Sequence, residues 1–166
     1  MIVPGLNYWY KSAQDLFGKV CRDKEKLSDS LSSQDQERIA DAVFNFAVTA
    51  YHVKDWLKQE GTKTFTPRDV EEYVNNNKVL SICADLCNGS KHRNFDDEKH
   101  NPRSTATGTG NSPLKVSMTS ITCSSSIPVT GFIPVIETAE GNQYDILTWA
   151  DQVVLAWEDF FTTHGI

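Results

Sequence analysis

The chain has 166 residues, of which 39% are hydrophobic and 23% charged, and its formal net charge at pH 7 is −6. This composition is that of a globular protein and excludes a disordered chain, and the length allows a core without disulfides or structural metal. The acidic balance gives no global electrostatic reason to bind nucleic acid or an anionic membrane, because clustered Lys and Arg drive such binding.

No segment of the sequence indicates export or membrane insertion. The first six residues lack the basic and apolar regions of a signal peptide, and no stretch approaches the ~20 apolar residues of a membrane span. The cysteines suit reduced thiols of a cytoplasmic protein, and they are Cys21, Cys83, Cys87 and Cys123. We therefore predict one cytoplasmic domain over residues 1–166.

The spacing of Cys83 and Cys87 places both thiols on one face of a helix, where they could share a metal. A zinc site needs about two further ligands, and no second Cys or His pair occurs at ligand spacing. The pattern therefore favours core cysteines, and we predict no metal and no cofactor.

Two long helices are expected in the first part of the chain. Apolar residues at spacings of three and four, Trp9 among them, predict a helix over 7–30. Ser33 and Gln36 form a Ser-x-x-Gln capping box that predicts a second helix over 34–59, with Gly61 at its end. We expect this second helix to be central, because it is apolar on nearly every side over 42–50, and expect the tryptophans to pack in the core.

Polar residues form two stripes on the predicted helices. The first, on the central helix, consists of Asp41, Asn45, Thr49 and His52. Thr66-Pro67 begins a third helical region, which is expected to break near 75–77 and to resume from 78 to about 92. Its second half carries the other stripe, which consists of Asp85, Asn88 and His92. The two stripes are candidates to meet inside the bundle.

The last part of the chain is expected to contain strands and one more helix. A polar loop is predicted over 94–112, then strands near 114–118 and 131–137, a turn at 140–142 and a short strand at Tyr144. A helix over 146–163 follows, with Gly165 as its stop. The predicted fold is mainly α (α+β): a four-helix-bundle-like core over about 6–93 and 145–164, with a small antiparallel β meander inserted at 113–144.

The segment that follows Cys87 concentrates residues suited to chemistry. Asn88-Gly89 inside a helical pattern costs about 1 kcal/mol relative to alanine at the glycine. One interpretation is a helix break whose free N–H groups, beside Lys91, His92 and Arg93, bind a phosphate. The other is an ordinary helix end, where cationic side chains face the negative end of the helix dipole.

The stretch 45–57, NFAVTAYHVKDWL, followed by CADLCNGSKH at 83–92, resembles an uncharacterised group of bacterial and phage-borne helical proteins. More distantly the arrangement resembles the HEPN superfamily, small helical bundles of which many are metal-independent ribonucleases in toxin–antitoxin and anti-phage systems. The HEPN motif is an arginine, a polar residue and a histidine a few residues later. Asn88 and His92 match its last two positions, whereas Cys87 occupies the arginine position. Arg93, Asn94 and His100 match the motif in a second register.

The resemblance implies roles for several of these residues. His92 would assist proton transfer from a ribose 2′-hydroxyl, while Arg93 or Lys91 would stabilise charge on the scissile phosphate. His52, with Asn45 and Asp41, would orient His92, or would form a purely structural buried network. The candidate catalytic residues are therefore His92, Asn88 and Arg93, and the candidate binding residues are Lys91, Asp85, His52, Asn45 and Asp41.

Three functional hypotheses follow, and they leave open whether the protein is an enzyme. The acidic charge, the polar loop and the missing motif arginine favour a non-catalytic, oligomeric interaction module of a phage–host conflict or defence system, with a protein partner or a second copy of itself. The alternative is a metal-independent HEPN-type endoribonuclease or RNA-binding domain that uses His92. The third is a small-ligand sensor for nucleotides, with the polar stripes as its pocket.

Overall fold

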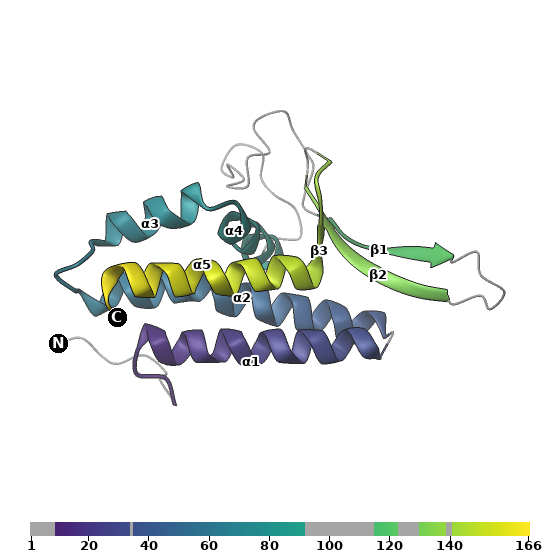
Figure 1. The fold of residues 1–166 in the computed structure, drawn as a ribbon, viewed down its shortest axis with the longest axis horizontal. Coiled ribbons are helices and arrows are strands. Elements are labelled where there is room, and N and C mark those ends of the chain that lie inside the picture. Colours follow the sequence, from purple (N-terminus) through teal and green to yellow (C-terminus); the bar gives the residue numbers. More distant parts are fainter. Residues whose placement is uncertain (1–8, 34, 92–114, 123–129, 139–140) are drawn as a thin grey trace.

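The computed structural model describes residues 9–33, 35–91, 115–122, 130–138 and 141–166. Within these ranges the chain forms five helices and three strands (Figure 1). In chain order they are α1 (Ala13–Ser32), α2 (Gln36–Glu60), α3 (Pro67–Asn76), α4 (Lys78–Lys91), β1 (Lys115–Thr122), β2 (Thr130–Glu137), β3 (Gln143–Asp145) and α5 (Ile146–His164). The predicted mainly helical fold, with a small antiparallel sheet before the last helix, is confirmed. The predicted loop at 94–112 lies outside the described residues.

The first helix begins later than its apolar pattern suggests. Ser12 is the N-cap of α1, and its hydroxyl accepts a 3.1 Å hydrogen bond from the amide of Asp15. Trp9 precedes this cap and is 78% exposed, so the prediction that it packs in the core was wrong. Helical spacing does not relate Trp9 to the buried stripe, because the backbone from Trp9 to Ser12 is not helical.

A carboxylate, and not the predicted serine, starts the second helix. The side chain of Asp35 accepts hydrogen bonds from the amides of Glu37 and Arg38 at 3.0 and 3.2 Å, while Ser33 is the C-cap of α1. The predicted Ser-x-x-Gln capping box is therefore wrong, since an aspartate one position before the helix offers a charged acceptor. The predicted helix end at Gly61 is confirmed, with φ at +56°.

The third helical region is divided as its sequence indicates. Thr66 and Asp69 form a reciprocal capping box in front of α3, with Pro67 at the start of the helix. Asn77 separates α3 from α4 with extended backbone, and its side-chain oxygen accepts a 3.2 Å hydrogen bond from the amide of Val79. The asparagine thus ends one helix and caps the next.

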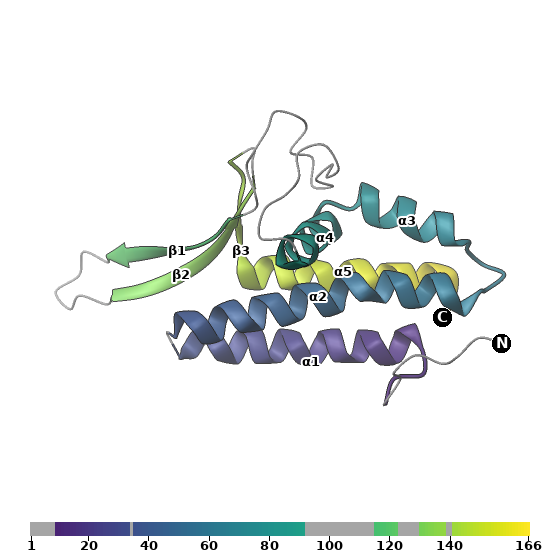
Figure 2. The same cartoon turned by 180° about the vertical axis from the view of Figure 1, so that it is seen from behind.

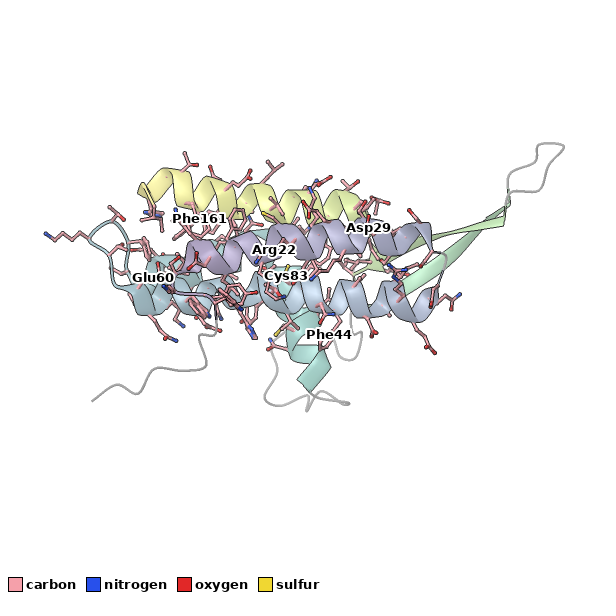
Figure 3. The ribbon with its side chains drawn as sticks, turned by 90° about the horizontal axis from the view of Figure 1, so that it is seen from below. Arg22, Asp29, Phe44, Glu60, Cys83 and Phe161 are labelled. Atoms are coloured by element: carbon pink, nitrogen blue, oxygen red, sulfur yellow. The ribbon has the colours of Figure 1, made fainter. Side chains whose placement is uncertain are left out.

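Helix α2 is central, as predicted, and packs against each of the other four helices. In Figures 1 and 2, α1, α2 and α5 run lengthwise and α4 is seen nearly end-on. Two tryptophans of α5 fix this arrangement: the indole N–H of Trp157 donates to the carbonyl of Ala50, and that of Trp149 donates to the carbonyl of Val79. Phe44 is the apolar exception on α2, being 48% exposed (Figure 3).

The sheet is antiparallel and has the order β1-β2-β3. β1 and β2 pair along their whole length, whereas β3 pairs only with the end of β2, after a turn in which Gly141 has φ at +81°. The β1–β2 hairpin extends away from the helices (Figure 1), and Ile136 of β2 is buried in the helical core. Asp145 is both the last residue of β3 and the N-cap of α5, where its side chain accepts a 2.8 Å hydrogen bond from the amide of Thr148.

Candidate functional site

The structure describes only part of the segment with the predicted catalytic residues. His92 and Arg93 lie outside the described residues, as does the second motif register at 93–100. Lys91 is the last residue of α4, and only its backbone is described. Asn88 and Asp85 are half-buried on α4. The predicted roles of these side chains therefore stay predictions.

Helix α4 runs without interruption through Asn88, Gly89 and Ser90 and ends at Lys91. A helix break at Gly89, which was one interpretation of the Asn-Gly pair, is therefore wrong. The amides at Gly89 and Ser90 are in helical backbone and are not presented as a phosphate cradle. The other interpretation, an ordinary helix end beside a run of cationic residues, stays a prediction, because the residues after Lys91 lie outside the described ranges.

The polar stripe of α2 reaches α4 through His52, whose contact there is Cys87, a residue outside the second stripe. His52 of α2 lies with its Nε2 4.0 Å from the Sγ of Cys87 on α4, directly before Asn88 in the chain. Cys87 is fully buried and His52 is half-buried. The imidazole thus faces a buried thiol, which is a weak hydrogen-bonding partner.

Cys83 and Cys87 are both fully buried, which confirms the prediction of core cysteines. Burial raises the pKa of the Cys83 thiol well above its ordinary value, and the neighbouring Cys87 raises it further. In the part of the chain that the structure describes, no group of three or more His, Cys, Asp or Glu side chains is arranged to hold a metal ion. Both thiols are therefore packing groups in a helix interface.

Asp41 and Asn45 lie in a different environment from His52. They line an open depression of about 450 Å³ between α1 and α2. The other residues that line it are Lys19, Asp23, Lys26, Asp29, Ser30, Arg38 and Ala42. The stripe on α2 is thus divided, because its N-terminal part faces α1 while His52 contacts α4.

A charged network forms the floor of this depression. Asp23 of α1 is only 3% exposed; its carboxylate accepts a 2.8 Å hydrogen bond from the hydroxyl of Thr49 and forms an ion pair with Lys19. The Nζ of Lys19 also donates to Thr49 Oγ1 at 2.8 Å, and Lys26 lies 3.3 Å from the other Asp23 oxygen. Thr49 was identified from the sequence, whereas Asp23 was missed, although the spacing of four between Lys19 and Asp23 was a signal.

A second buried charge lies where α2 meets α3. Lys54 is 5% exposed; its Nζ donates a 2.8 Å hydrogen bond to the hydroxyl of Tyr51 and lies 3.5 Å from the carboxylate of Glu71. Glu71 also accepts a 2.6 Å hydrogen bond from Lys58, which raises the pKa of that lysine. This cluster was not predicted from the sequence, although Lys54 follows Ala50 by four residues and precedes Leu57 by three, which is the spacing of the buried face of α2.

None of the described helices is long and apolar enough to cross a membrane. Comparison of the chain with protein-family models, with curated proteins and with solved structures finds no significant match. The candidate sites therefore rest on geometry alone: the Cys87–His52 contact, the charged depression between α1 and α2, and the buried Lys54 cluster.

Proposed function

We propose that the chain is a non-catalytic interaction module, HEPN-like and oligomeric, that binds another cytoplasmic protein in a phage–host conflict or defence system. The observation that carries this proposal is the environment of Cys87. It occupies the arginine position of the HEPN-like pattern, and its side chain is fully buried against His52.

A ribonuclease that follows this pattern needs a cation at that position in contact with a phosphate. The side chain of Cys87 is fully buried, so a longer side chain at this position would start from inside the helix interface. A guanidinium at this position would lose its hydration, at a cost of several kcal/mol. The position thus supports packing and not phosphate contact.

Two further features support an interaction role. The β1–β2 hairpin extends away from the helical body, where its backbone is set apart from the helices and offers a surface to another molecule (Figure 1). The net charge of −6 gives RNA no overall electrostatic attraction, whereas protein interfaces need none.

The proposal is tested by incubating the wild-type protein and a His92→Ala variant with mixed cellular RNA in the presence of a chelator. We expect intact RNA with both proteins over a wide range of protein concentration. Cleavage by the wild type that disappears in a folded His92→Ala variant would contradict the proposal and identify a metal-independent ribonuclease.

The interaction itself is tested separately. Sedimentation of the purified chain should show an oligomer, and a tagged chain should recover a defined protein partner in a fixed stoichiometry that persists at raised salt. RNA affinity that dominates at low salt and falls steeply as salt is added would instead indicate a nucleic-acid-binding domain.

A further inference from the structure

The depression between α1 and α2 has the size of a ligand site. Its volume is about 450 Å³, within the range of roughly 300–1,000 Å³ in which small-molecule sites occur. Its residues come from the second half of α1 and the first half of α2, two helices that lie side by side in Figure 3, where Asp29 is labelled on α1.

The charges that line the depression are balanced. Three side chains are cationic and three are anionic: Lys19, Lys26 and Arg38 against Asp23, Asp29 and Asp41. A ligand with charge of one sign, such as phosphate or a polyamine, would be attracted by one set and repelled by the other. A ligand that carries both signs gains from both sets.

The lining also limits the chemical nature of the ligand. Among the described residues that line the depression, none is aromatic and Ala42 is the only apolar one. A nucleobase normally gains much of its affinity by stacking on an aromatic or apolar surface. The described lining of the depression offers no such surface. It therefore does not favour a nucleotide as the ligand, which was the ligand expected in the hypothesis of a small-ligand sensor.

The buried residues at the floor of the depression keep their contacts when a ligand binds, whereas the exposed side chains at its edge are available to the ligand. Asp23 keeps Thr49 and Lys19 as partners even if Lys26, which is 3.3 Å away and 72% exposed, turns toward a ligand. At the rim, the side chains of Arg38, Asp29 and Asp41 are exposed, and within the described residues none of them forms a hydrogen bond or ion pair. A ligand can therefore engage them without breaking an existing contact.

We propose that this depression binds a small zwitterion of the free α-amino acid class. Lys26 and Arg38 take the carboxylate, and Asp29 and Asp41 take the ammonium group. The Asn45 amide, which can donate and accept, is placed for a polar ligand side chain. This site is independent of the proposed interaction function and would make the module responsive to a metabolite.

The site is tested by following the amide NMR signals of the folded protein during titration with the protein L-amino acids, one at a time. Inorganic phosphate, spermidine and adenosine monophosphate serve as comparison probes. We expect at least one amino acid to shift the signals of lining residues in a saturable way, and the comparison probes not to do so at equal concentration. The absence of saturation with every amino acid, or an equal response to phosphate or spermidine, would overturn the proposal.

Two variants locate the binding. Arg38→Gln and Asp41→Asn each remove one charge-assisted contact and should weaken the affinity at least about tenfold. Both residues are exposed, so the melting temperature of each variant should equal that of the wild type. Arg68→Gln on α3, where the side chain is 85% exposed and outside the depression, is the matched control and should bind as the wild type does. Unchanged affinity in both Arg38→Gln and Asp41→Asn would refute the assignment.

Discussion

The hydroxyl of Thr49 on α2 donates a 2.8 Å hydrogen bond to the carboxylate of Asp23 on α1, and both residues are buried. A buried carboxylate is tolerated only where hydrogen bonds and an opposite charge compensate it, and here Thr49 and Lys19 do so together. The pair therefore sets how α1 and α2 align along their length.

Replacement of Thr49 by valine should destabilise the protein by about 1–3 kcal/mol. Valine has nearly the same shape but leaves an oxygen of Asp23 without its hydroxyl donor. Thr49→Ser, which keeps the hydroxyl, is the control and should cost less. Urea unfolding measures both, and equal losses for valine and serine would show that the methyl group, and not the hydrogen bond, is what matters.

Replacement of Cys87 by arginine should reduce stability by at least about 3 kcal/mol, because a cation would be placed in a fully buried position without a partner. Cys87→Ala, which leaves only a small cavity, should cost about 1–2 kcal/mol. Thermal and denaturant unfolding compare the two. A Cys87→Arg variant that is as stable as the wild type and cleaves RNA would contradict this expectation and show that a side chain at this position can contact a phosphate.

The thiol of Cys83 should be protected from alkylation in the native protein. It is fully buried and its pKa is raised by burial, so both access and thiolate formation are suppressed. Mass spectrometry after iodoacetamide treatment should show Cys21, which is only half-buried, reacting at least about tenfold faster. Similar rates for the two thiols would indicate that α4 opens locally.

Tyr73 should make stability depend on pH in the alkaline range. Burial raises the pKa of Tyr73 to about 12, and a hydrogen bond to Asp159 and its negative charge add to the effect. The folded protein holds this proton more tightly than the unfolded chain, whose tyrosine has a pKa of about 10. The stability that the neutral phenol contributes is therefore fully present below about pH 10 and is lost as pH rises through about 12.

A Tyr73→Phe variant isolates this contribution. It should be less stable than the wild type at pH 8, since the hydroxyl also donates to the carbonyl of Ala156 at 2.6 Å. The difference should narrow as pH rises from about 10 to about 12, because only the wild type has this phenol to ionise. Unfolding curves across this range measure it, and a difference that stays constant with pH would contradict the assigned shift.

The helical architecture could be predicted because its signals are local. Gly61 and Gly165 end α2 and α5 in left-handed backbone, and Thr66-Pro67 starts α3, as their residue types indicate. The start of α2 was predicted wrongly because Ser33 and Asp35 compete for the same role, and periodicity does not decide between adjacent acceptors.

The charged sites were only partly predictable because they depend on contacts between distant segments. Asp41 and Asn45 were identified as polar interruptions of an apolar helix, but their neighbours on α1 follow from the packing of α1 against α2. Lys54 was missed for the same reason, since its burial depends on Tyr51 and on Glu71 of another helix. A single sequence contains the residue types but not their pairing.

At Asp145 the strand β3 passes directly into the helix α5, without an intervening loop. Asp145 pairs with Val135 as the last residue of β3, and its side chain begins α5 at Thr148. Next to it Ile146 is anchored in the core, as is Ile136 on the neighbouring strand. No loop separates β3 from α5, so a displacement of β3 would act directly on the first turn of α5.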